Sequence, residues 1–213
     1  FAVLDSDLTK TVPMKQVISG AFDTLSHCME TYMGKPQATN LSDEINEAVM
    51  RNVITNLRRL IRNPDDDFAR GELMWASAMA ENGMLKLGKQ TDFQCHMIEH
   101  AVGAYTDCNH GQGLAVIHPA LYRRLLEAGK EKLARMAETV WGVKGTTIEE
   151  TAMRGIEALE AFIREIGLPT HWSEMGITDE SMLRAAADTC ILTPGCCRLL
   201  TRDEIFELLM ERM

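Results

Sequence analysis

The sequence predicts an all-α fold with one short strand at the N-terminus. Apolar residues recur every three or four positions over most of the 213 residues, which is the period of a helix buried on one face. Proline, glycine and asparagine interrupt this pattern at intervals typical of helix ends. The opening residues Phe1 to Asp5 resemble a strand, and almost no strand pattern follows Leu4.

Each expected helix has a recognisable start or stop. Pro13 precedes the first helix and Pro36 follows it, while Asn63-Pro64 ends the second. Pro119 lies inside a later helical pattern, where we expect a bend. The expected helices cover residues 14–33, about 42–62, 67–87, 93–106, 110–126, 129–141, 147–166, 179–189 and 202–213. No repeat interrupts them, so we expect one domain over 1–213.

Composition narrows the class of protein. Hydrophobic residues make up 46% and charged residues 25% of the chain, which excludes disordered and fibrous proteins. The net charge of −9 argues against nucleic acid or an anionic membrane as a partner. No apolar run approaches the roughly 18 residues of a membrane span. Six cysteines without a CxxC pair indicate reduced thiols and a cytoplasmic location.

The N-terminus predicts a fragment of a longer protein. The chain begins at Phe1 within the strand-like pattern, without an initiator methionine, a basic region or a cleavage site of a signal peptide. We therefore expect a further segment before Phe1.

Histidines and one aspartate indicate a metal site. Only six histidines occur in the chain, yet His96, His100 and His110 lie within 15 residues. Asp23 and His27 are four residues apart, so both lie on one face of the first helix, about 6 Å apart along its axis. A carboxylate and several imidazoles among apolar helices would be costly unless a cation joined them. Iron and zinc both accept such nitrogen and oxygen ligands.

Another interpretation starts from the segment 96–100, which has the H-x-x-E-H pattern of inverted zinc peptidases. Both histidines of the motif would bind zinc, and Glu99 would act as general base in a hydrolase. This leaves Asp23, His27 and His110 without a role, so it is the minor alternative.

Three motifs resemble the iron-containing (group III) alcohol dehydrogenases, most closely their NADPH-dependent butanol dehydrogenase and aldehyde reductase branch. They are LTKTVPMKQVISGAFDTLSH over 8–27, CHMIEHAVGA over 95–104 and NHGQGLA over 109–115. Family members have an Asp and a His four residues apart, then two His fourteen residues apart. The resemblance implies the metal ligands Asp23, His27, His96 and His110.

This resemblance also implies the fold and the activity. The chain would be the multi-helix C-terminal domain, without the N-terminal α/β domain that holds the nucleotide, so no cofactor-binding residue is assigned here. The cofactors would be Fe²⁺ or Zn²⁺ and NADP(H) or NAD(H), and the substrate a small alcohol or aldehyde. The full-length protein would be a homo-oligomer, and the isolated fragment inactive. His100 would lie beside the nicotinamide and transfer a proton.

Other conspicuous residues have structural interpretations. His118 and His171 are expected to be structural. Trp75 and the methionines at 74, 79 and 84 lie at helical spacings and are expected in the core.

Overall fold

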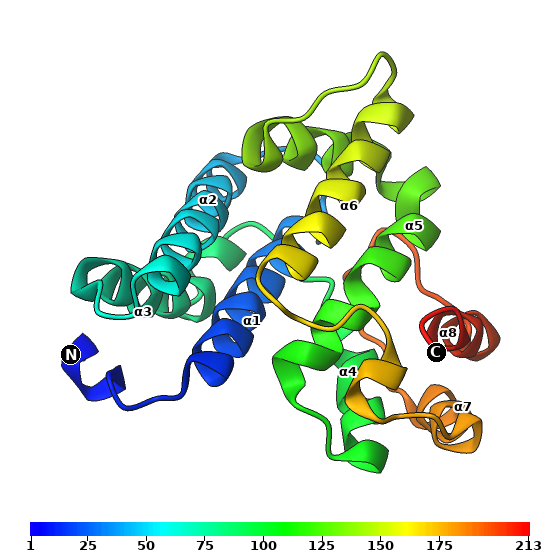
Figure 1. The fold of residues 1–213 in the computed structure, drawn as a ribbon. Coiled ribbons are helices and arrows are strands. Elements are labelled where there is room, and N and C mark those ends of the chain that lie inside the picture. Colours follow the sequence, from blue (N-terminus) through cyan, green and yellow to red (C-terminus); the bar gives the residue numbers. More distant parts are fainter.

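A computed structural model describes all residues, 1–213, and is built from eight α-helices (Figure 1). One isolated antiparallel bridge, between Lys35 and Gln90, is the nearest approach to a sheet. The helices are α1 (Met14–Tyr32), α2 (Leu41–Arg62), α3 (Asp67–Glu81), α4 (Gln94–Thr106), α5 (His110–Met136), α6 (Ile148–Glu165), α7 (Glu180–Thr189) and α8 (Arg202–Met210). Short turns η1 (Ser6–Thr9), η2 (Met84–Lys86), η3 (Ala137–Trp141) and η4 (Trp172–Met175) complete the fold. The all-α prediction is confirmed.

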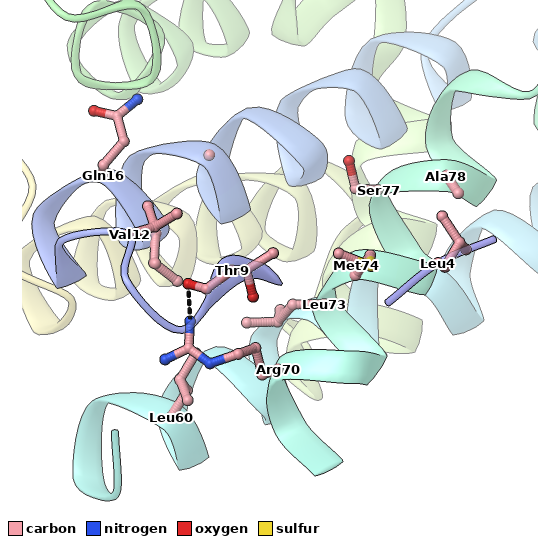
Figure 2. A pocket seen from close by; sticks show the side chains of 12 residues that line it. Leu4, Thr9, Val12, Gln16, Leu60, Arg70, Leu73, Met74, Ser77 and Ala78 are labelled. Atoms are coloured by element: carbon pink, nitrogen blue, oxygen red, sulfur yellow. Dashed lines mark hydrogen bonds between the residues drawn. The ribbon is translucent and has the colours of Figure 1, made fainter. Parts of the chain in front are cut away.

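The expected opening strand is not formed. Phe1 to Asp5 have no regular structure, because no other strand of this chain pairs with their backbone groups. The turn η1 that follows them lies over α3, where Nη1 of Arg70 donates a hydrogen bond of 3.0 Å to the carbonyl oxygen of Thr9. Figure 2 shows this bond at the edge of an apolar cavity of about 480 Å³, which is lined by residues before α1 together with α1 and α3.

Two helix boundaries differ from the prediction. The third helix ends at Glu81 rather than at residue 87, because Gly83 adopts a left-handed conformation with φ of 89°. The two helices expected over 110–126 and 129–141 are one continuous helix, α5, followed by the π-turn η3. Gly129 is buried there, and a Cβ atom on it would lie 2.8 Å from Cε of Met33. Close packing against Met33 therefore explains this glycine, and no turn is needed.

The central helix of the fold is α5, which packs against α1, α4 and α6. Figure 1 shows α2 and α3 at one edge of the molecule and α7 and α8 at the opposite edge. Fully buried side chains between these layers include Phe22, Met29, Leu57, Tyr122 and Trp172. No helix combines the length and the apolar composition that a membrane crossing needs.

The edge position of α3 corrects one prediction about the core. Trp75 is 64% exposed and Met84 is 46% exposed, so neither belongs to the core. Met79 is partly buried and packs against it. Helix α3 contacts α1 and α2 on one side only, and Trp75 lies on the side that faces solvent.

A buried cluster of charges joins α2, α5 and the loop that leads to α4. Oδ2 of Asp43 accepts a hydrogen bond from Nζ of Lys132, and Oδ1 of Asp43 forms an ion pair with Nζ of Lys89 at 2.7 Å. All three side chains are at most 1% exposed. Burial lowers the pKa of Lys132 to about 8, although Asp43 acts in the opposite direction. Asp43 is thus the charge that compensates two buried lysines.

We expect Asp43→Asn to lower the free energy of unfolding by about 3–5 kcal/mol, because it leaves buried ammonium groups without their counter-charge. Urea denaturation at neutral pH measures this. The matched control is Glu165→Gln, which breaks an exposed pair with Arg58 and is expected to cost about 0–1 kcal/mol. Equal stability of the two variants would contradict the prediction.

Candidate metal centre

Three helices bring the four predicted ligands together. Asp23 and His27 lie one turn apart on α1, His96 is in the first turn of α4, and His110 is the first residue of α5. The turn between α4 and α5 is short because Asp107 adopts a left-handed φ of 53°. Asn109 then caps α5 by accepting a hydrogen bond from the backbone N–H of Gln112.

The donor atoms of Asp23, His96 and His110 all lie within 4.8 Å of one another, and Nε2 of His27 lies close to the donors of Asp23 and His96. Oδ1 of Asp23 lies 3.3 Å from Nε2 of His96, 3.3 Å from Nε2 of His110 and 3.5 Å from Nε2 of His27. The Nε2 atoms of His27 and His96 are 3.2 Å apart. Ligands held at about 2.1 Å from one cation in a tetrahedral arrangement lie about 3.4 Å from each other. The spacing of the donors therefore fits a bound divalent cation.

Carboxylates flank the other nitrogen of each ring. Nδ1 of His96 donates to Glu30, and Nδ1 of His110 donates to Glu99. Oε1 of Glu81 lies 2.6 Å from Nδ1 of His27, although not in hydrogen-bonding geometry. Metal-binding histidines typically donate their remaining N–H to a carboxylate or carbonyl. This feature also fits a metal centre.

The carboxylates of the cluster attract the protonated rings of His96 and His110, and the pKa values of both kinds of group shift accordingly. Burial raises the pKa of Asp23, but contacts with His110 and His96 outweigh it and hold the pKa well below its usual range. Burial likewise lowers the pKa of His96, but Asp23 and Glu30 raise it to about 9. Asp23 and Glu99 raise the pKa of His110 to about 10. A cation entering the site would displace protons from these rings.

His27 and His100 have pKa values below the ordinary one. For His27 the causes are burial and the neighbouring His96, and for His100 they are burial and the neighbouring His110. The His100 ring is solvent-exposed, and its centroid lies 5.2 Å from that of His110. His100 is therefore next to the centre but outside the four converging donors.

The geometry favours the four-residue set over the H-x-x-E-H interpretation. Oε2 of Glu99 is bonded to Nδ1 of His110, so this carboxylate serves a histidine outside the motif. The rings of His96 and His100 lie edge-on, with centroids 6.0 Å apart. Two groups of three residues offer ligand atoms within 4.8 Å of one another: Asp23, His96 and His110, and Glu99, His100 and His110. The second group includes the exposed His100, and its Glu99 is already bonded to His110.

Sequence reasoning did not identify Glu30 or Glu81. Glu30 follows Asp23 by seven residues and therefore lies on the same face of α1, two turns further on. An acidic residue in register with Asp23 and His27 was the available signal. No comparable signal marked Glu81, because only the packing of α3 against α1 brings it to His27.

The two remaining histidines lie outside the centre. His118 is fully buried, its Nε2 is 2.6 Å from Oγ of Ser26, and burial lowers its pKa to about 3. His171 is at the start of η4 and is exposed. The apolar cavity in Figure 2 includes none of the four predicted ligands, although Gly20, which lines it, precedes Asp23 by three residues.

With this fold and this cluster in place, comparison with known proteins identifies the family. Residues 17–213 match the model of the Fe-containing alcohol dehydrogenase family, C-terminal. The chain therefore belongs to this family and corresponds to its C-terminal domain, as the sequence motifs indicated.

Particular relatives are dehydrogenases and reductases. The chain is 33% identical to NADH-dependent butanol dehydrogenase A of Clostridium acetobutylicum over 213 residues, covering 98% of this chain and 55% of the relative. It is 32% identical to the NADPH-dependent aldehyde reductase YqhD of Escherichia coli, covering 85% of this chain and 47% of the relative.

Solved structures agree with this assignment. NADH-dependent butanol dehydrogenase A of Thermotoga maritima matches with a TM-score of 0.90 at 30% identity, over 98% of this chain and 55% of that one. The substrate- and cofactor-free form of YqhD from E. coli matches with a TM-score of 0.91 at 30% identity, over 100% of this chain and 57% of that one. The chain thus spans about half the length of the relatives that it matches.

We expect His96→Ala in the complete protein to weaken Co²⁺ binding by more than about 100-fold. Loss of a residue that only hydrogen-bonds to a metal-binding histidine already weakens binding by about 10- to 100-fold, and loss of the histidine itself should weaken it further. Competition with a chelator measures the affinity. His171→Ala removes an exposed histidine and should leave the affinity unchanged. Equal affinities of the two variants would exclude His96 as a ligand.

Proposed function

We propose that this chain is the metal-binding and catalytic half of an NAD(P)H-dependent alcohol dehydrogenase or aldehyde reductase. The reaction is hydride transfer between a small primary alcohol or its aldehyde and the nicotinamide. The observation that carries this proposal is the convergence of Asp23 Oδ1 with Nε2 of His27, His96 and His110, in a chain of this family.

Asp23, His27, His96 and His110 would hold Fe²⁺ or Zn²⁺. When bound, such a cation supplies Lewis-acid chemistry, which polarises an aldehyde carbonyl or lowers the pKa of an alcohol. The residues contribute one carboxylate and three imidazoles, and so neutralise only part of the charge of a divalent cation. The same donor set accepts both metals, so availability would decide between them.

His100 is the proposed group for proton transfer. Its ring is next to His110 and open to solvent, and burial and the neighbouring His110 lower its pKa, which favours the uncharged form that can accept a proton. In this role it would exchange the proton of the alcohol hydroxyl with water, while the three histidine ligands remain unprotonated at Nε2.

The nucleotide would be bound by a separate N-terminal half. These 213 residues contain no strand followed by a glycine-rich turn and a helix, the arrangement that commonly holds a dinucleotide pyrophosphate. The curated relatives are about twice as long as the matched region. We therefore propose that substrate and nicotinamide meet where an α/β half covers the metal centre.

The activity test is oxidation of NADH and NADPH by butyraldehyde. We expect the metal-loaded protein to turn over when the nucleotide-binding half is present, and residues 1–213 alone to show no turnover, because nothing anchors the nucleotide phosphates. Absorbance at the nicotinamide band follows the reaction. Turnover by residues 1–213 alone would refute the proposal that a separate N-terminal half binds the nucleotide. Absence of turnover in the metal-loaded complete protein, over a range of alcohols and aldehydes, would refute the proposed function.

We expect His100→Ala to lower kcat of the complete protein by about 100-fold, the lower end of the range for a general acid or base. It should also remove one ionisation from the pH–rate profile. His171→Ala is the control of the same residue type. An unchanged rate and pH–rate profile for His100→Ala would show that this histidine only lines the pocket and does not transfer a proton.

A further inference from the structure

We propose that Glu30 and Glu99 are positioning residues, which fix the rings of His96 and His110 so that both Nε2 atoms face Asp23. The inference rests on the metal centre of the proposed function. Neither carboxylate is among the four ligands, and each contacts a ligand histidine from the side away from the converging donors.

Glu30 is held rigidly from several sides. Its side chain is fully buried, and its Oε1 accepts a hydrogen bond of 2.5 Å from the backbone N–H of Cys95. Its Oε2 accepts one of 3.3 Å from the backbone N–H of His96 and another from Nδ1 of the same residue. The first turn of α4 thus clamps a carboxylate of α1. Because both oxygens have fixed partners, the carboxylate cannot rotate away from the ring.

Glu99 occupies a space that the sequence leaves open for it. The residue is 2% exposed, its Oε2 accepts from Nδ1 of His110, and Sγ of Cys108 donates to its Oε1 over 3.6 Å. A Cβ atom on Gly113 would lie 2.8 Å from both Cγ and Oε1 of Glu99. Any larger residue at 113 would force this carboxylate out of its present position. The glycine inside α5 is therefore explained by the position of Glu99.

These contacts decide which nitrogen of each imidazole faces Asp23. A carboxylate only accepts hydrogen bonds, so Nδ1 keeps its hydrogen and Nε2 is the nitrogen that gives up its proton to an entering cation. The orientation of each ring is then set before any cation arrives. His27 lacks such a partner, because Glu81 is 48% exposed and its contact is not in hydrogen-bonding geometry.

The first experiment replaces each carboxylate by its neutral isostere in the complete protein. We expect Glu30→Gln and Glu99→Gln each to weaken Co²⁺ binding by about 10- to 100-fold, as loss of an outer partner of a metal-binding histidine does. The visible absorption bands of bound Co²⁺ should also shift, because the ligand field changes. The control Glu165→Gln, which changes an exposed carboxylate paired with Arg58, should leave both the affinity and the bands close to those of the unaltered protein.

A second experiment displaces Glu99 without changing any charge or ligand. Gly113→Ala adds one methyl group that collides with Glu99, and we expect weaker Co²⁺ binding and shifted bands. The matched control is Gly71→Ala, also within a helix, where the nearest atom to the new Cβ is Oγ of Ser6 at 3.8 Å. Thermal unfolding of the metal-free variants verifies that each is folded. Because alanine favours helices over glycine, a general loss of stability would not explain the effect.

The outcomes separate this inference from the proposed function. Unchanged affinity and bands in Glu30→Gln, Glu99→Gln and Gly113→Ala, together with lost binding in Asp23→Asn, would overturn the positioning role and leave the metal centre intact. Failure of the unaltered protein to bind Co²⁺, Zn²⁺ or Fe²⁺ would overturn both.

Discussion

The arrangement of the central helices depends on one interaction, the contact of the Asp23 carboxylate with the imidazoles of His27, His96 and His110. Asp23 lies on α1, and the first turns of α4 and α5 both contact it through a histidine. Polar groups in such an interior are costly unless each finds a partner. The short turn between α4 and α5, with Asp107 in a left-handed conformation, brings the second of these histidines into reach. Helices α1, α4 and α5 thus meet at the polar cluster around Asp23, and the apolar core packs around these helices.

The burial of the four side chains decreases from one side of this centre to the other. The side chain of His96 is 2% exposed and that of His27 is 19% exposed, whereas Asp23 and His110 are 30% and 39% exposed. The buried side is held by Glu30 and the backbone of α4. The open side includes His100. A substrate or a covering domain would therefore approach from the side of His110 and His100, opposite His96, the most buried of the four candidate ligands.

Helical periodicity and ligand spacing could be predicted from the sequence because both are local. The helix starts at Met14, Asp67 and His110 follow from nearby proline, aspartate and asparagine residues. Asp23 and His27 are on one face because a helix turns by about 100° per residue. The continuity of α5 through Gly129 could not be predicted, since a glycine that ends a helix and one that admits Met33 look alike in a sequence. Exposure of Trp75 also depends on how few helices cover α3.

The sequence by itself determined the family, the helical class and which four residues are candidate ligands, because motifs and spacing are properties of neighbouring positions. Only the tertiary structure decided that Glu30, Glu81 and Glu99 flank the three histidines. It also decided that Gly113 leaves the space that the side chain of Glu99 occupies. These contacts join residues up to 66 positions apart. Their geometry follows from how the helices pack, which local patterns do not specify.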